Sequence, residues 1–137
     1  MKKGKILVIN ARYYEEIIVN LYKDVQSFLN KKVKHDVINV PGIFEIPVVI
    51  SKNINKYDGF IALGCVIKGQ TPHFDFISKA TIDAIMKLSV VSKKPIGNGI
   101  LTCLNYKQAK ERSVKKGKKE GKGTEAAKAL LQVLNNF

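Results

Sequence analysis

Arginine is scarce in this sequence, although basic residues are abundant. Of 24 basic residues only Arg12 and Arg112 are arginines, and the formal net charge is +13. Reading of base edges and bidentate clamping of phosphate favour the planar fork of arginine over the point charge of lysine. Sequence-specific recognition of nucleic acid is therefore disfavoured, and the lysines indicate a solvated basic surface. The two arginines become candidates for positions where a fork is needed.

Cysteines and long hydrophobic runs are also few. Cys65 and Cys103 have no partner at metal or redox spacing, so we interpret them as small buried hydrophobic residues. The longest apolar runs, 6–9 and 60–67, are far shorter than the about 20 residues of a membrane span. Too few apolar residues follow the basic start for a signal peptide. We expect a cytoplasmic protein without membrane contact.

Nucleotide fingerprints are missing as well. The chain has no Walker pattern, and Asn10-Ala11-Arg12 stands where a glycine-rich dinucleotide turn would follow the first strand. A length of 137 residues with 45% apolar content is typical of one domain, which we expect to span 1–137. The one low-complexity stretch, 115–123, is rich in lysine and glycine and predicts a loop.

Four short segments that are apolar throughout predict strands over 5–10, 37–40, 60–66 and 95–104. Helical spacing of apolar residues predicts helices over 17–29, 44–54 and 73–91, then from about 107, and a last one containing Ala127, Leu130, Leu131 and Leu134. The helix that starts at His73 is expected to use Thr71 and Pro72 as N-cap and first residue. Its expected core face is Phe74, Ile77, Ile82, Ile85, Met86 and Val90.

This alternation of strands and helices, with strands lacking a polar side, favours a parallel sheet covered on both faces. Right-handed crossovers then give a flavodoxin-like, three-layer α/β/α sandwich with a four-stranded parallel sheet. Ligands bind beyond the carboxyl ends of the strands in such sheets. The loops at 11–14, 41–45 and 68–73, and the region after Leu101, are therefore the candidate site.

The turn Gly69-Gln70-Thr71 opens a helix and is suited to an anion such as phosphate, because free N–H groups and the helix dipole favour negative charge. Many such turns serve only to cap the helix. His73 in the first helical turn could transfer protons at neutral pH, although an isolated histidine is more often structural. Tyr13 could stack on a flat ring, although an aromatic residue at the start of a helix more often serves packing. Glu45 could accept hydrogen bonds from hydroxyl groups, although an acidic residue at a helix N-terminus is also favoured by the dipole alone. No function is assigned to His35.

Four blocks of the sequence, in order along the chain, resemble lumazine synthases. They are Val40-Pro41-Gly42-Ile43-Phe44-Glu45-Ile46-Pro47; Leu63-Gly64-Cys65-Val66-Ile67-Lys68-Gly69-Gln70-Thr71-Pro72-His73-Phe74-Asp75-Phe76; Gly99-Ile100-Leu101-Thr102 with Gln108-Ala109-Lys110-Glu111-Arg112; and Lys122-Gly123-Thr124-Glu125-Ala126-Ala127. The second block is the most specific, and the resemblance covers nearly the whole chain.

The resemblance implies a role for each matching residue. Tyr13 would stack on a pyrimidinedione, Phe44 and Glu45 would contact its ribityl chain, and the backbone of Val66 and Ile67 would bind its ring. Gln70 and Thr71 would bind phosphate, and His73 would be the general acid and base. Arg112, and less specifically Lys122, would reach the phosphate from a neighbouring subunit.

The implied reaction condenses 5-amino-6-(D-ribitylamino)uracil with 3,4-dihydroxy-2-butanone 4-phosphate, releasing phosphate and water, without metal or cofactor. The implied assembly is a homo-oligomer with sites between subunits. Two departures stand out. Asn98 replaces a phenylalanine that covers the pyrimidine from the neighbouring subunit in many members. The segment between Arg112 and Lys122 looks longer than the common form, which favours a pentamer over a larger shell.

Two other functions also fit the sequence. The lysine-rich segment 107–122 could dock on RNA or an acidic membrane, in which case binding would fall steeply with salt. A flavodoxin-like protein could instead hold a flavin, and the purified protein would then be yellow. The convergence of the motifs on the ends of the strands favours the enzyme.

Overall fold

The computed structural model describes residues 4–114 and 119–137. Its centre is a parallel four-stranded sheet in the order β2-β1-β3-β4. The strands are β1 (Ile6–Ala11), β2 (His35–Val40), β3 (Gly59–Ile67) and β4 (Ile96–Cys103). The four strands are those that the apolar segments predict, with ends that differ by at most two residues.

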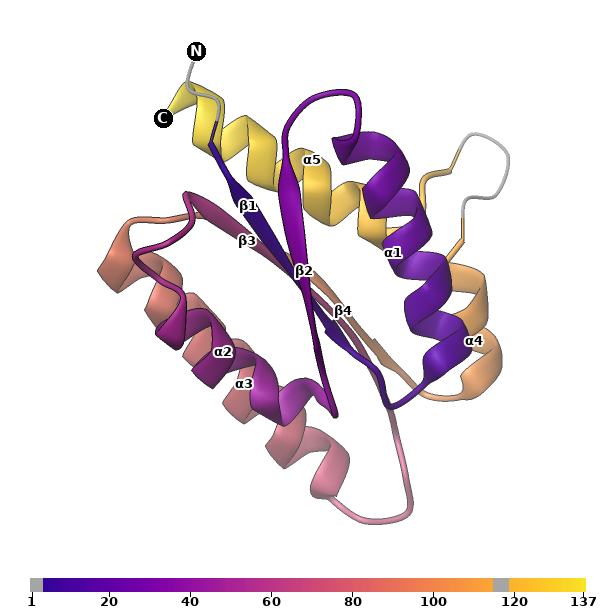
Figure 1. Cartoon of the computed structure of the whole chain (residues 1–137). Helices are drawn as coiled ribbons and strands as arrows, with labels where there is room; N and C mark the ends of the chain where they lie inside the picture. The colour runs from indigo at the N-terminus through magenta and orange to yellow at the C-terminus, as the bar shows by residue number, and fades with distance from the viewer. Residues whose placement is uncertain (1–3, 115–118) are drawn as a thin grey trace.

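Helices cover both faces of the sheet. They are α1 (Glu15–Leu29), the 3-10 helix η1 (Ile43–Glu45), α2 (Ile46–Lys52), α3 (His73–Ser92), α4 (Tyr106–Arg112) and α5 (Lys122–Asn136). Helices α1, α4 and α5 lie on one face, and α2 and α3 lie on the other (Figure 1). The expected flavodoxin-like α/β/α sandwich is confirmed. None of the helices in the described part of the chain is long and apolar enough to cross a membrane.

Strand β1 divides its side chains between two hydrophobic cores. Ile6 and Val8 pack toward α1 and α5, whereas Leu7 and Ile9 pack toward α2 and α3, and all four are fully buried. A strand that is buried on both faces has no solvent side, which explains why the sequence shows continuous apolar runs rather than alternation. The central strands therefore form a rigid platform for the loops at their carboxyl ends.

The turn after β2 approaches β3 closely. A Cβ atom on Gly64 would lie 2.5 Å from Cγ2 of Ile43, so a glycine is needed for η1 to pack on the strand. The helical segment expected over 44–54 is divided into η1 and α2, with Pro47 in the first turn of α2 as expected. The close packing places Phe44 at the carboxyl edge of the sheet.

The predicted core face of α3 is wrong at two positions. Met86 is 62% exposed and Val90 is 67% exposed, whereas Thr81 and Ile85 are the buried residues of this helix. Apolar residues occur around more than one side of α3, so spacing alone does not tell which side meets the sheet. The other side remains uncovered in the single chain.

The expected start of α3 is also corrected. Pro72, rather than Thr71, is the N-cap residue, and the first helical residue is His73. The hydroxyl oxygen of Thr71 accepts a hydrogen bond from the backbone N–H of His73 at 3.4 Å, as in a serine/threonine turn. The predicted loop at 115–123 lies partly outside the described residues.

Candidate active site

A cavity of about 360 Å³ opens where β1, β2 and β3 end and α3 begins. This is the edge at which parallel α/β sheets bind ligands. Its walls are formed by Tyr13, Tyr14, Gly42, Ile43, Phe44, Cys65, Val66, Ile67, Gly69, Thr71, His73, Phe74 and Ile77. Most of these side chains are apolar or aromatic, and the few polar groups lie on the α3 side. Such a lining suits a flat organic molecule with a polar end.

Two large aromatic side chains at this cavity are unusually exposed. Tyr13 is 75% exposed and Phe44 is 61% exposed. The ring of Tyr13 meets that of Tyr14 edge to face, with 4.9 Å between centroids and an angle of 81° between planes. Tyr14 is more enclosed, and burial raises the pKa of its hydroxyl. The exposed faces of Tyr13 and Phe44 are available to a planar ligand.

The polar end of the cavity lies at the start of α3. His73 is the first residue of this 20-residue helix, and its side chain is exposed to the cavity. Gly69 lies in the preceding turn, with open space where a Cβ would be. The first N–H groups of a long helix carry partial positive charge, so an anion is favoured at this point. An imidazole and an anion-favouring helix end thus lie side by side.

Glu45 has a structural role beside its candidate one. Its Oε1 accepts a hydrogen bond of 2.9 Å from the backbone N–H of Gly42, which closes the turn after β2. Glu45 is the last residue of η1 and does not line the cavity. Gln70 does not line it either, and its side chain is exposed.

A second cavity, of about 380 Å³, lies between the ends of α4 and α5. Arg112 and Lys122 line it together with Lys119 and the carboxylates of Glu111, Glu120 and Glu125. Arg112 is the last residue of α4, where a cation suits the helix dipole, whereas Lys122 begins α5, where it does not. The two cavities share no lining residue, so His73 and Arg112 line different cavities of one chain.

Comparison with known proteins identifies the family of the chain. A family model described as 6,7-dimethyl-8-ribityllumazine synthase matches residues 3–137. The chain belongs to this family. A protein of that name from Bartonella tribocorum is 42% identical over 141 residues, covering 99% of this chain and 93% of the relative. One from Bartonella bacilliformis is 45% identical over 132 residues (92% and 85%), and one from Agrobacterium fabrum is 40% identical over 142 residues (98% and 95%).

Membership in the lumazine synthase family makes the chain a transferase of riboflavin biosynthesis. Within this framework the structure gathers part of the predicted site. The residues that meet at the first cavity are Tyr13, Phe44, Val66, Ile67, Thr71 and His73. Arg112 and Lys122 meet at the second cavity. Asn98 lines neither: it lies on the edge strand β4, is exposed, and its Oδ1 accepts a 3.0 Å hydrogen bond from Ile100 N–H.

Other cavity residues escaped the sequence-based prediction. Tyr14 and Cys65 both line the first cavity, and Phe74 and Ile77, expected in the core, face it as well. For Tyr14, the only signal in the sequence is its position next to Tyr13. The interpretation of the cysteines is confirmed, because Cys65 is 6% exposed and Cys103 is 1% exposed, and burial raises the pKa of Cys65 to about 12.

The arginine fork of Arg12 is used within the chain. Its Nε and Nη2 atoms each donate a 2.8 Å hydrogen bond to one carboxylate oxygen of Glu15 at the start of α1. This bond raises the pKa of Arg12 and lowers that of Glu15. Arg12 is one of the two candidates for a fork-shaped contact. Its contact with Glu15 spans Tyr13 and Tyr14 and stabilises the turn that carries them.

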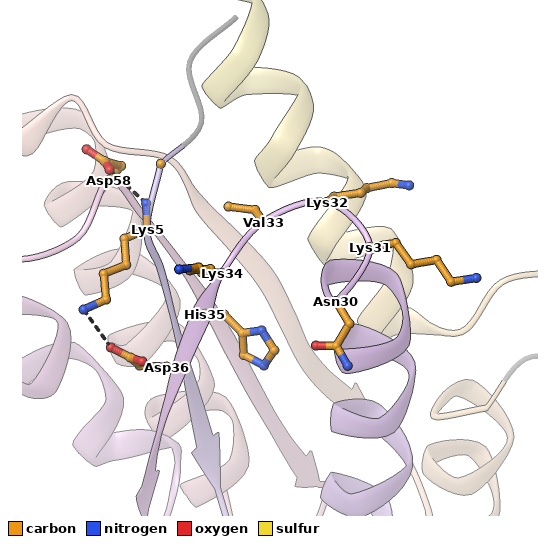
Figure 2. A pocket seen from close by; sticks show the side chains of 10 residues that line it. Lys5, Asn30, Lys31, Lys32, Val33, Lys34, His35, Asp36 and Asp58 are labelled. Atoms are coloured by element: carbon orange, nitrogen blue, oxygen red, sulfur yellow. Dashed lines mark hydrogen bonds and ion pairs between the residues drawn. The ribbon is translucent and has the colours of Figure 1, made fainter.

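A larger hollow of about 1090 Å³ lies at the opposite, amino end of the sheet. Four lysines line it, and Lys5 among them pairs with Asp36 at 3.1 Å (Figure 2). The ammonium of Lys32 lies 4.7 Å from the ring centroid of Phe28. None of the predicted site residues lines this hollow. The Lys5 charge is paired, and the lysines form a solvated basic surface.

Proposed function

We propose that the cavity at the start of α3 is the place where this chain condenses 5-amino-6-(D-ribitylamino)uracil with 3,4-dihydroxy-2-butanone 4-phosphate. The observation that carries the proposal is the juxtaposition of an exposed aromatic wall, a histidine and an anion-favouring helix end in one cavity of about 360 Å³. The family assignment supports this choice of substrates, and the lining of the cavity supports a binding place for each of them.

The pyrimidinedione ring is assigned to the aromatic end of the cavity. Tyr13 stacks on the ring, and the backbone of Val66 and Ile67 at the end of β3 offers hydrogen bonds to its edge. Phe44 and Glu45 contact the ribityl chain; Oε1 of Glu45 is occupied by Gly42, which leaves Oε2 for a hydroxyl group. The strand ends are rigid, so the ring is held in a fixed orientation.

The phosphate of the ketose is assigned to the turn of Gln70 and Thr71 at the start of α3. Binding the phosphate there brings the ketone carbon toward the amine of the stacked ring, and orientation of two reactants is itself a large source of rate. Arg112 of a neighbouring subunit completes the phosphate site, with Lys122 beside it, and Asn98 of that subunit lies over the pyrimidine.

The chemistry needs proton transfer and no redox change. The free amine attacks the ketone, and loss of one water gives an imine; a proton leaves carbon as inorganic phosphate departs; the second amine then closes the ring with loss of another water. His73 is placed to move these protons, and the guanidinium of Arg112 stabilises the charge of the leaving phosphate. No cofactor or metal enters these steps.

We further propose that the working unit is a homopentamer, with a larger shell as an alternative. A histidine and an arginine that serve one phosphate lie at separate cavities of the same chain, which a neighbouring copy would bring together. Helix α3 also has an uncovered apolar side that carries Phe76, Met86, Val90 and Val91, each more than 60% exposed. We place the enzyme in the cytoplasm, with small molecules as substrates and with neither specific nucleic acid nor a membrane as partner.

The proposal is tested by mixing the purified chain with both substrates. We expect the fluorescent lumazine to form together with one inorganic phosphate per turnover. His73→Ala should lower kcat by about 100-fold or more while the circular dichroism spectrum stays unchanged. Unchanged kinetics in that variant would remove His73 from the mechanism, and absence of product from the unaltered chain would refute the proposed function.

A further inference from the structure

Three tyrosine rings form a row that runs from α4 into the first cavity. The centroids of Tyr13 and Tyr14 are 4.9 Å apart, and those of Tyr14 and Tyr106 are 6.3 Å apart with an interplanar angle of 57°. Tyr13 and Tyr14 line the cavity, whereas Tyr106, the first residue of α4, does not. A residue outside the cavity therefore contacts one of the two rings that shape its wall.

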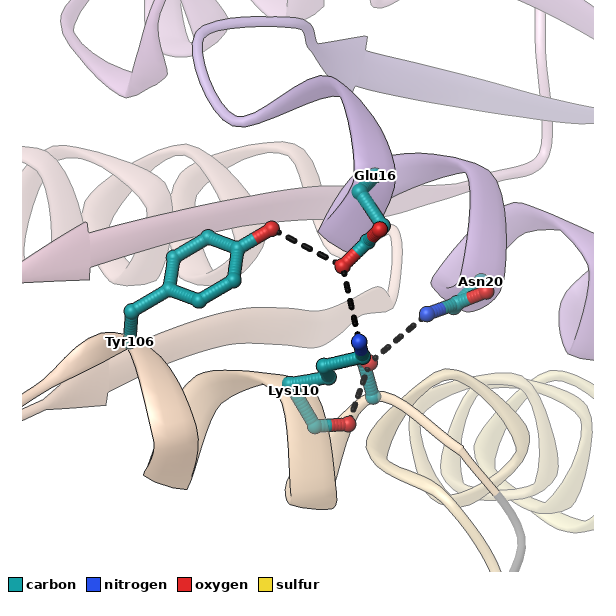
Figure 3. Close-up of polar contacts among 5 residues, drawn as sticks. Glu16, Asn20, Tyr106 and Lys110 are labelled. Carbon is teal, nitrogen blue, oxygen red and sulfur yellow. Dashed lines mark hydrogen bonds and ion pairs between the residues drawn. The ribbon is translucent and has the colours of Figure 1, made fainter.

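Tyr106 is fixed at its far end. Its hydroxyl donates a 3.0 Å hydrogen bond to Oε1 of Glu16 on α1, and the same oxygen lies 3.4 Å from the ammonium of Lys110 (Figure 3). The tyrosine hydrogen bond and the lysine charge lower the pKa of Glu16, so that its carboxylate stays ionised near neutral pH. A charge-assisted hydrogen bond is stronger and more directional than a neutral one, which restricts the ring of Tyr106.

Helix α4 is attached to α1 by a second, separate contact. Nδ2 of Asn20 donates a 3.3 Å hydrogen bond to Oγ of Ser113, and this hydroxyl donates in turn to the backbone carbonyl of Lys110 at 2.7 Å. Ser113 is fully buried. Figure 3 shows Asn20 and the ring of Tyr106 on opposite sides of Lys110. Helix α4 thus has an anchor on α1 that does not involve Tyr106.

We propose that Tyr106, held by Glu16, is a positioning residue for the flat substrate: it supports Tyr14, which in turn sets the orientation of Tyr13. The inference rests on the proposed function of the cavity. Tyr13 is 75% exposed, so without the neighbouring ring it could occupy several rotamers. A supported ring loses less conformational freedom when a ligand stacks on it, which raises the affinity for that ligand.

The proposal predicts an effect on one substrate only. Tyr13 is assigned to the pyrimidinedione, whereas the turn of Gln70 and Thr71 is assigned to the ketose phosphate. Loss of the support should therefore raise KM for the pyrimidinedione and leave KM for the ketose phosphate unchanged. A purely structural role for Tyr106 would instead displace α4 with Arg112 at its end, and would affect the ketose phosphate.

The experiment compares Tyr106→Leu, Tyr106→Phe and the matched control Asn20→Ala. KM for each substrate is measured, and the dissociation constant of a 5-nitro analogue, which lacks the attacking amine, is measured by titration. Tyr106→Leu removes the ring and should weaken binding of the analogue about fivefold, the size of one aromatic contact. Tyr106→Phe keeps the ring and loses the Glu16 bond, and should weaken it about twofold. Asn20→Ala should leave it unchanged.

The proposal is overturned if Tyr106→Leu binds the analogue like the unaltered protein, or if it changes KM for both substrates in the manner of a displaced helix. Should Tyr106→Leu fail to fold, Tyr106→Phe, which keeps the shape of the side chain, decides the same question through the same dissociation constant. Formation of lumazine by the unaltered chain in the same assays keeps the two hypotheses separate. If the unaltered chain makes no product, the proposed function fails; if it does and the variants bind normally, only the positioning role fails.

Discussion

The guanidinium of Arg112 lies against the thiol of Cys103, with 3.9 Å between Nη1 and Sγ. Cys103 is the last residue of β4 and is 1% exposed. The contact therefore holds the guanidinium at a fixed position on the sheet. The rest of the Arg112 side chain is exposed and borders the second cavity. The arginine is therefore attached to its own chain at one point and directed to the surface.

Replacement of Arg112 by lysine should show whether a fork is needed. Arg112→Lys keeps the positive charge but cannot bind a phosphate through two parallel hydrogen bonds. We expect KM for the ketose phosphate to rise about tenfold or more, with KM for the pyrimidinedione unchanged. Steady-state kinetics with each substrate varied in turn measure this. Equal effects on the two substrates would contradict a role confined to the phosphate.

Cys65 should be chemically inert in the folded protein although it lines a cavity. Its pKa is raised to about 12, chiefly by burial, so the reactive thiolate is only about one part in ten thousand at pH 8. We expect iodoacetamide at pH 8 to label Cys65 at least about 100-fold more slowly than it labels the unfolded chain. Peptide mass analysis over time measures the two rates. Fast labelling in the native state would show that this wall of the cavity opens.

The stability of the fold should decrease in mild acid because of His35. Burial lowers the pKa of its imidazole, opposed only in part by the neighbouring Asp36 carboxylate. As the pH falls below about 6.5, the unfolded chain binds more protons than the native state, so the free energy of unfolding decreases. Above that pH, His35 is neutral in both states and this loss is absent. Urea unfolding at pH 7.5 and 5.5 should show a loss that is smaller in His35→Gln. An equal loss in that variant would assign the effect to other groups.

The uncovered side of α3 should be the site of self-association. Met86 is 62% exposed within a patch that also carries Val90 and Val91, and a charge buried in such a contact is unfavourable. We expect Met86→Lys to lower the native mass from that of an oligomer toward that of the 15.3 kDa chain, with helix content unchanged. Gln132→Lys on α5 adds the same charge elsewhere and should leave the mass unaltered. A Met86→Lys protein of full native mass would exclude this surface.

The sequence predicts the layers of the fold because burial on both faces makes β1 and β3 continuously apolar. The prediction fails on α3, where exposed apolar residues have the same helical spacing as buried ones. Met86 and Val90 have helical spacing, as the residues that face the sheet do, and only the path of the chain shows that they point outward. Apolar spacing therefore does not say which of two apolar sides of a helix packs against the sheet.

The candidate site is predictable to the same degree. The loops that follow β1, β2 and β3 meet because parallel strands end at one edge, and this brings Tyr13, Phe44 and His73 together. Tyr14 and Tyr106 could not be placed, since their row depends on how α4 packs on α1. The separation of Arg112 from His73 is likewise a property of the folded chain.

The most direct test of a site shared between copies is a mixing experiment with two inactive variants. His73→Ala and Arg112→Ala are denatured together in equal amounts, refolded, and assayed for lumazine formation. If His73 and Arg112 of different copies serve one phosphate, about a quarter of the sites in a random oligomer have both residues, and about a quarter of the unaltered activity returns. Activity no higher than that of the two variants refolded separately would contradict the shared site.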